Sequence, residues 1–174
     1  MSELPFETIT INSQLELTQF TPDDAARLFE LTNNNREYLE RFLPWVPAVG
    51  TVDDSLAHIN ETIANRLLGK AFTYGIKYRD EFVGNISIMH IDEPDKTEIG
   101  YWIDEAHSGL GITTLAVEAL TNLGLSVLGL TKLHIRASPD NIGSNKVAEK
   151  AGYVFEGLIQ DHTHGALNVW SMST

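Results

Sequence analysis

Residues 102–114 read WIDEAHSGLGITT, and this segment indicates a strand that passes through a short loop directly into a helix. Gly109 and Gly111 occupy the loop, and Thr113 and Thr114 follow in the first helical turn. The first turn of a helix presents unpaired N–H groups and partial positive charge, so it holds phosphate groups well. Glycine also lets the backbone approach such a group closely. The segment therefore predicts a phosphate site, although two glycines also suit a simple tight turn.

The loop does not match the common nucleotide-binding patterns. A dinucleotide fingerprint requires glycine or alanine at the position of Thr114, and a GxxxxGK[ST] loop requires a lysine after its second glycine. Lys96 is the only lysine or arginine within residues 80–131. We therefore expect backbone amides and the helix end to hold the phosphate, with Lys146 and Lys150 as candidate cations.

Upstream of this loop, the hydrophobic pattern predicts a strand, then helices, then more strands. Residues 7–20 alternate weakly and predict a first strand. Thr21 and Thr51 each begin a capping pattern that is followed by apolar residues at helical spacing. Alternating residues then predict antiparallel strands at 72–78, 82–91 and 98–103.

Downstream, helices and strands alternate. The predicted elements are a helix at 111–123, a strand at 132–137, a helix at 142–151, and strands at 153–159 and 166–172. No repeat or linker divides the chain, so we expect one domain over residues 1–174. Its predicted class is α+β (mixed α/β), with a strand–helix–strand unit inserted into an antiparallel sheet.

The composition excludes several classes of protein. Among 174 residues, 43% are apolar and the formal net charge is −12, which argues against nucleic-acid binding and suits either a cationic amine substrate or plain solubility. The absence of cysteine excludes disulfides, cysteine zinc sites and an acyl-cysteine intermediate. The chain start lacks a signal-peptide pattern, and the most apolar stretch, 114–133, contains polar breaks. We therefore expect a cytoplasmic protein without a membrane partner.

Several motifs taken together resemble the GNAT acetyltransferases. They are IGYWI at 99–103, GLGI at 109–112, DNIGSN at 140–145 and EKAGY at 149–153. The resemblance is strongest to the ribosomal-protein N-terminal acetyltransferases and covers nearly the whole chain. It implies a mostly antiparallel sheet of six to seven strands flanked by helices, with one parallel pair splayed at the site of the co-substrate acetyl-CoA. It also implies an amine acceptor and a homodimer.

The resemblance also assigns roles to individual positions. Ile103 and its strand neighbours would bind the pantetheine arm through main-chain groups, the loop would surround the diphosphate, and Asn141 would lie beside the thioester. The full set implied for the cofactor is Trp102, Ile103, Ser108, Gly109, Leu110, Gly111, Ile112, Thr113, Asn141 and Ser144.

The chain departs from the family pattern at three positions. Ala106 stands where Gln or Arg is frequent, and Ser108 stands where a bulky polar residue is usual. Ala148 replaces the tyrosine that protonates the thiol in many members. The ribosomal-protein subfamily offers a serine instead, and Ser144 matches it.

For the chemistry, we expect direct transfer from the thioester to an amine while both substrates are bound. Ser144 is the candidate proton donor to the thiolate, and its alternative role is to cap or pack the following helix. Glu98 is the candidate base, with His90, Asp92 or a water as alternatives, and it also fits an exposed strand residue. The candidate acceptor-binding residues are Trp45, His90 and Tyr101.

The sequence does not name the acceptor. An α-amine, with a pKa of about 8, needs less help to become a neutral nucleophile than a lysine-type amine. This suits the N-terminal α-amine of a ribosomal protein, which the resemblance implies as the acceptor. The alternatives are a small amine such as a polyamine or aminoglycoside, or a non-catalytic acyl-CoA-binding module. His162 and His164 lack an evident third ligand, so we expect no metal.

Overall fold

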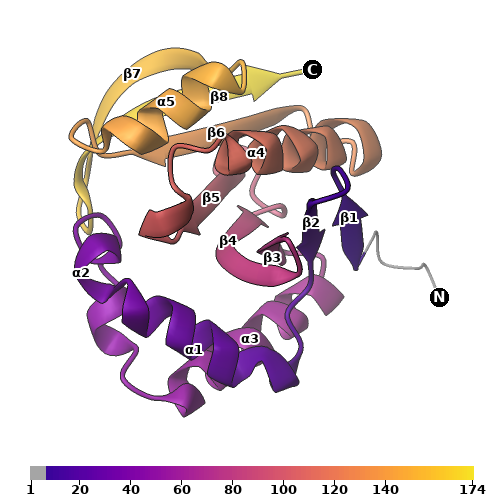
Figure 1. Cartoon of the computed structure of the whole chain (residues 1–174). Coiled ribbons are helices and arrows are strands. Elements are labelled where there is room, and N and C mark those ends of the chain that lie inside the picture. The colour runs from indigo at the N-terminus through magenta and orange to yellow at the C-terminus, as the bar shows by residue number, and fades with distance from the viewer. Residues whose placement is uncertain (1–6) are drawn as a thin grey trace.

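One continuous sheet organises the computed structural model, which describes residues 7–174 (Figure 1). Within that range it has eight strands in the order β1-β2-β3-β4-β5-β6-β8-β7, and only β5 and β6 are parallel. The strands are β1 (Thr8–Thr10), β2 (Leu15–Thr18), β3 (Phe72–Tyr78), β4 (Glu81–Met89), β5 (Glu98–Ile103), β6 (Lys132–Ala137), β7 (Val154–Asp161) and β8 (Gly165–Ser173). The expected mixed α+β class is confirmed.

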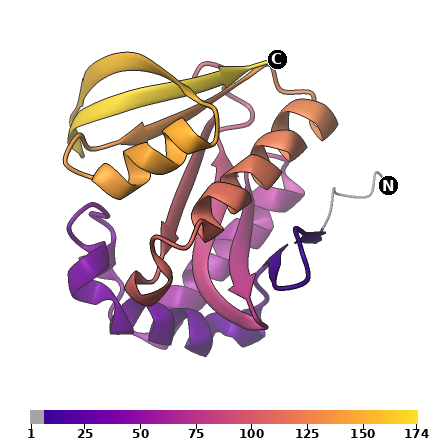
Figure 2. The same ribbon diagram turned by 45° about the horizontal axis from the view of Figure 1, so that its top comes forward.

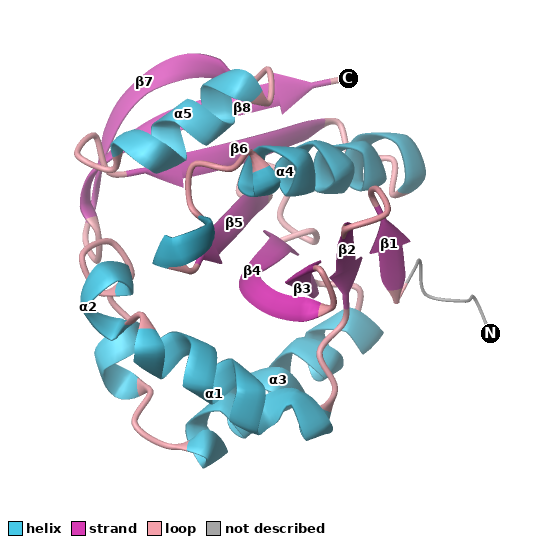
Figure 3. Ribbon diagram, in the orientation of Figure 1, coloured by secondary structure: helices cyan, strands magenta, loops and turns pink. Residues whose placement is uncertain are grey.

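Helices cover both faces of this sheet (Figures 2 and 3). They are α1 (Ala25–Asn34), α2 (Arg36–Leu39), α3 (Val52–Leu67), α4 (Ile112–Asn122) and α5 (Ile142–Lys150). The predicted cap of α3 is present, because the Thr51 side chain accepts a hydrogen bond from Asp54 N while the Asp54 carboxylate accepts one from Thr51 N. Helices α4 and α5 pack with the large core cluster, whereas α1 and α3 form a second cluster with Phe20 and Phe82.

The first predicted strand is divided in two. The Asn12 side chain accepts a hydrogen bond from Gln14 N at 2.8 Å, and Ile11 N donates to Leu15 O at 2.9 Å. This turn reverses the chain, so β1 and β2 pair as a hairpin instead of forming one strand over 7–20. The sheet therefore contains eight strands, where six to seven were expected.

The parallel pair β5–β6 is joined at one position only. Glu98 pairs with His134, and His134 N donates to Thr97 O at 3.0 Å. Towards Ile103 and Ala137 the two strands have no further register pairs, and Figure 2 shows them separating. The loops that lead to α4 and α5 begin at these separated ends, so both helices start beside the gap.

The apolar stretch 114–133 forms α4 and the turn that follows it. Beyond Asn122 the helix widens over Leu123–Val127, where Leu128 N donates to Leu123 O at 2.9 Å, and the chain then turns into β6. No helix within residues 7–174 is long and apolar enough to cross a membrane. The start of the chain, where a signal-peptide pattern was not expected, lies outside the described residues.

Candidate functional site

A cavity of about 380 Å³ lies where β5 and β6 separate. Four segments form its wall: α2 and the residues after it, the end of β5, the glycine loop with the start of α4, and α5 with its N-cap residue Asn141. The lining residues are Tyr38, Leu39, Phe42, Leu43, Tyr101, Trp102, Ile103, His107, Ser108, Gly109, Gly111, Ile112, Thr113, Thr114, Asn141, Ile142, Gly143, Ser144, Lys146, Val147 and Lys150. Most of the residues expected to bind the cofactor are thereby brought together.

The glycine loop has the backbone shape that a phosphate site needs. Gly109 and Gly111 have φ values of 76° and 80°, in the left-handed region that favours glycine. A Cβ at either position would meet no atom within 4 Å, so the backbone angle and not crowding requires glycine there. Gly111 is the N-cap of α4, so the first amides of α4 have no partner within the helix and lie at the cavity.

A carboxylate–histidine pair stands at the entrance to this loop. Asp104 Oδ1 accepts hydrogen bonds from His107 N at 2.9 Å and from the His107 ring, with Nδ1 at 2.6 Å. The edge of the same ring meets the Tyr78 ring, with 5.7 Å between centroids. His107 lines the cavity. His107 was not among the site residues predicted from the sequence, although the Asp-x-x-His spacing before the glycines indicates it.

Ser144 and Tyr101 are hydrogen-bonded to each other beside the cavity. Ser144 Oγ donates to Tyr101 Oη at 3.1 Å, and Tyr101 Oη donates to Ser144 O at 2.9 Å. Burial raises the pKa of Tyr101 above its usual value, and this outweighs the opposing effect of the Ser144 hydrogen bond. Asn141 caps α5 by accepting a hydrogen bond from Ser144 N at 3.2 Å. Asn141 and Tyr101 therefore fix the position of Ser144.

The opposite wall comes from α2 and the chain that follows it. The cavity is lined here by Tyr38, Leu39, Phe42 and Leu43. No sequence motif marks these residues as part of a site. Trp45 does not line the cavity, but its ring lies against that of Trp102, with 6.2 Å between centroids. It is 41% exposed.

Two polar residues at the α1–α2 junction hold this wall in place. Arg36 donates hydrogen bonds to Val46 O at 2.9 Å and to Val49 O at 2.6 Å, which fixes the loop that carries Trp45. Asn35 Oδ1 accepts a hydrogen bond from Glu105 N at 3.0 Å, at the start of the turn before the glycine loop. One junction thus positions two sides of the cavity.

Several other expected residues do not reach the cavity wall. Glu98 forms an ion pair with Arg136, with 3.7 Å between Oε2 and Nε, and His90 Nδ1 lies 3.4 Å from Glu93. Strand register explains their position: Glu98 and Met89 are opposite each other at one end of the β4–β5 ladder, and Ile103 is at the other end. Asp92 lies in the turn beyond His90, and Leu110 is 61% exposed.

The wall suits acetyl-CoA. The α4 amides and Lys146 and Lys150 can hold negatively charged phosphates, while the separated edge of β5 offers main-chain groups to an extended arm bearing amides. Ile103 and Val147 add apolar surface. Within residues 7–174, no aspartate or glutamate lines the cavity.

Comparison with known proteins gives consistent relatives. A family model described as an acetyltransferase (GNAT) domain matches residues 14–154. The ribosomal-protein-serine acetyltransferase of Escherichia coli (strain K12) is 32% identical over 155 residues, covering 88% of this chain and 87% of that protein.

Solved structures agree with this result. RimL, a ribosomal L7/L12 alpha-N-protein acetyltransferase solved with coenzyme A, matches with a TM-score of 0.90 at 26% identity, covering 96% of this chain and 98% of its own. The microcin C7 self-immunity acetyltransferase MccE, solved with acetyl-CoA and AMP, has a TM-score of 0.89 at 26% identity, covering 98% of both chains. The chain is therefore an acetyl-CoA-dependent N-acetyltransferase that belongs to the GNAT family and is similar to ribosomal-protein acetyltransferases.

Proposed function

We propose that this enzyme acetylates the N-terminal α-amine of a protein, and that its acceptor is a ribosomal protein. The observation that carries the choice of amine is the lack of any carboxylate on the cavity wall within residues 7–174. At pH 7 roughly one α-amine in ten is neutral, against about one lysine-type amine in 2,500. A site without a carboxylate base therefore favours an α-amine. It also gives a polyamine no partner for its charges. The names of the E. coli relative and of RimL support the ribosomal acceptor.

Acetyl-CoA supplies the activated acetyl thioester, and the chain positions and protects it. We assign the diphosphate to the amides and hydroxyls of residues 108–114, and the pantetheine arm to the main chain of Trp102 and Ile103. Asn141 holds the start of α5 so that Ser144 faces the sulfur. Tyr38, Phe42 and Trp102 would enclose the reacting amine together with the water molecule that serves as its base.

The proton transfers can be assigned with the same residues. Ser144 donates a hydrogen bond to the thiolate as it leaves. Because the thiol has a pKa of about 8.5, its thiolate needs only modest stabilisation at neutral pH. A water molecule removes the proton from the amine, because Glu98 is engaged by Arg136 and lies about 16 Å from Ile103 at about 3.3 Å per strand residue.

The direct test is an acetyl-transfer assay with a panel of amines. The panel contains peptides with free serine or alanine N-termini, the same peptides with blocked N-termini, an internal-lysine peptide, spermidine and an aminoglycoside. Thiol release with the free N-termini alone is the expected result. Release with spermidine or the aminoglycoside alone would contradict the proposal in favour of a small-amine enzyme.

A measurement of CoA binding, set beside the transfer assay, distinguishes a non-catalytic acyl-CoA-binding module from an enzyme. Calorimetry with CoA and acetyl-CoA should show binding that Gly109→Trp abolishes, because tryptophan disfavours the left-handed backbone of the loop and adds bulk at the cavity wall. Binding without transfer to any amine would support a non-catalytic acyl-CoA-binding module. Absence of binding would contradict the cofactor site itself.

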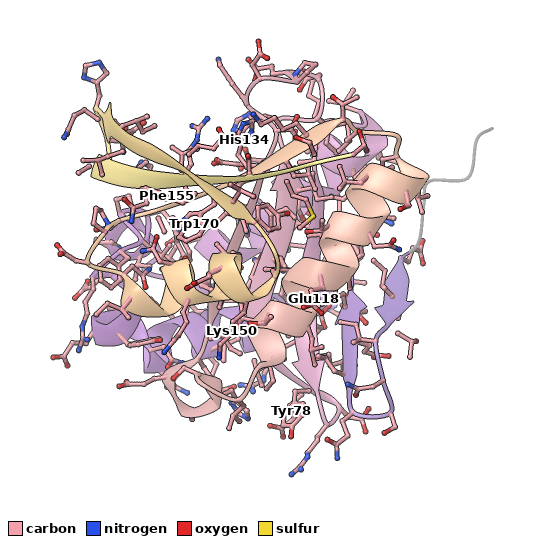
Figure 4. The ribbon with its side chains drawn as sticks, turned by 90° about the horizontal axis from the view of Figure 1, so that it is seen from above. Tyr78, Glu118, His134, Lys150, Phe155 and Trp170 are labelled. Carbon is pink, nitrogen blue, oxygen red and sulfur yellow. The ribbon has the colours of Figure 1, made fainter. Side chains whose placement is uncertain are left out.

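We also propose that the chain acts as one cytoplasmic domain that forms a homodimer. The end strand β7 exposes apolar side chains, as Figure 4 shows for Phe155 beside Trp170, with 5.4 Å between ring centroids. The exposed members are Val154, Phe155, Leu158 and Ile159. Such a strip on an end strand favours burial against a second copy. Sedimentation should give a dimer for the wild type and a monomer for Phe155→Glu, and a wild-type monomer would contradict the proposal.

A further inference from the structure

The Asp104–His107 pair has a free nitrogen at the phosphate loop. Nδ1 is held by the Asp104 carboxylate, and Nε2 has no hydrogen-bond partner within the described residues 7–174. The side chain of His107 is 29% exposed and lies on the cavity wall beside Ser108 and Gly109. A carboxylate that binds one imidazole nitrogen orients the ring, which leaves the other nitrogen to face a ligand.

The same local structure occurs a second time, away from the cavity. Asp161 Oδ1 accepts hydrogen bonds from His164 N at 2.9 Å and from the His164 ring, with Nδ1 at 3.0 Å. It closes the turn between β7 and β8, and neither residue lines the cavity. The two Asp-x-x-His units therefore share their local hydrogen bonds, but only His107 lines the cavity.

The phosphate loop lacks other basic residues. Residues 80–131 contain Lys96 alone as a lysine or arginine, and Lys96 is paired with Glu93 at 3.1 Å. The lysines on the cavity wall, Lys146 and Lys150, come from α5 on another side of the cavity. The loop itself thus offers a diphosphate no cation except a protonated His107.

We propose that His107 binds the cofactor diphosphate through Nε2–H and takes up a proton when it does so. This inference rests on the proposed placement of the diphosphate in the glycine loop. The proton comes from the solvent, the imidazole becomes an imidazolium between the Asp104 carboxylate and a phosphate oxygen, and no covalent bond changes. Histidine is the side chain whose ordinary charge change lies between pH 5 and 8, so binding of the cofactor becomes pH-dependent in that range.

The charged and titratable groups around His107 favour this uptake. Asp104 and Glu105 lie in the same turn as His107. The Tyr78 ring, from β3, contacts the His107 ring, and the Arg79 guanidinium lies over the Tyr78 ring, 5.0 Å from its centroid. Lys146 and Lys150 face the cavity from α5 and oppose a further positive charge on His107 until the diphosphate binds. Because the bound form holds the extra proton, the affinity must fall as the pH rises, by at most about tenfold per pH unit for one proton.

The experiment is titration calorimetry with dephospho-CoA at about pH 6.5, near the ordinary pKa of histidine. Dephospho-CoA is chosen because the 3′-phosphate of CoA is a monoester that itself titrates near about pH 6. Repeating the titration in PIPES and in Bis-Tris, whose ionisation enthalpies differ, gives the number of protons taken up. The variants are His107→Gln, His107→Phe and the matched control His164→Gln, each checked for folding by circular dichroism.

We expect the wild type and His164→Gln to take up a measurable fraction of a proton and both His107 variants to take up none. His107→Phe keeps a ring against Tyr78 but loses the charged hydrogen bond, so binding weakens about tenfold or more. Binding without proton uptake in the wild type, or uptake that persists in folded His107 variants, overturns the inference and leaves the cofactor site intact. If dephospho-CoA and CoA both fail to bind the wild type, the proposed site and the inference fall together.

Discussion

Replacing Ser144 with alanine separates a catalytic role from a structural one. The change removes the 3.1 Å hydrogen bond from Ser144 Oγ to Tyr101 Oη. The main-chain O of residue 144 still accepts the Tyr101 hydroxyl proton at 2.9 Å, and the cap from Asn141 to the main-chain N is retained. The cavity should therefore keep its shape.

The structural and catalytic effects then differ greatly in size. One lost neutral hydrogen bond costs about 0.5–1.5 kcal/mol of unfolding free energy. For a chain of this length each kcal/mol lowers Tm by about 2–4 °C. Loss of a hydrogen bond to the charged thiolate costs about 1.5–3 kcal/mol in the transition state, which is roughly ten- to a hundredfold in kcat. We expect a small drop in Tm, a large drop in kcat, and an unchanged affinity for acetyl-CoA.

Steady-state thiol release with a free N-terminal peptide measures kcat, and differential scanning fluorimetry measures Tm. Ser126→Ala is the matched control, because its Oγ donates to Asn122 on an exposed turn outside the cavity. A Ser144→Ala enzyme with the kcat of the wild type would refute the assignment. Ser144 would then serve only to pack α5 against Tyr101.

Three further predictions concern the loop, the acceptor wall and the core. Gly111→Ala and Gly129→Ala each force alanine into a left-handed backbone and should each cost about 1–2 kcal/mol of unfolding free energy, but calorimetry should show weaker CoA binding only for Gly111→Ala. Arg36→Ala releases the loop that carries Trp45, so kinetics should show a higher KM for the acceptor peptide with unchanged CoA affinity. The control is Arg27→Ala, which removes a hydrogen bond from Arg27 to Phe82 O and should change neither quantity. Burial raises the pKa of Tyr153 to about 12, so the stabilising contribution of its neutral hydroxyl is complete below about pH 10 and is lost as the pH rises from there. Urea unfolding should show the free energy of unfolding falling by at most about 1.4 kcal/mol per pH unit in this range. The fall should be smaller in Tyr153→Phe.

Hydrophobic alternation predicted the central strands well, although the structure buries both faces of β3 and β4. The strands that became β3, β4, β5 and β6 alternate clearly, and their expected bounds agree with the structure to within about two residues, the usual uncertainty in element ends. The hairpin β1–β2 was missed because alternation continues through Asn12. The reversal there depends on a side chain that accepts a hydrogen bond from the backbone.

The cofactor part of the site was easier to anticipate than the acceptor part. The glycine loop and the start of α5 are local motifs, and both reach the cavity. Tyr38 and Phe42 resemble core residues of a short helix, and nothing local indicates that they face a cavity. Glu98 was expected near the reaction because it shares a strand with Ile103, although the predicted bounds 98–103 already put the two at opposite ends, as the register with β4 confirms.

The single residue pair between β5 and β6 has a consequence for how the native state opens. The chain has a five-strand half, β1 to β5, and a three-strand half, β6 to β8, whose strands meet side by side only at Glu98 and His134. Amides along this seam should exchange with solvent through local separation of the two halves, at a lower free energy than amides within either half. A ligand lodged in the seam binds only the closed state, so it should slow exchange in strands from both halves at once. The bound cofactor would then hold the two halves of the sheet together as well as supply the acetyl group.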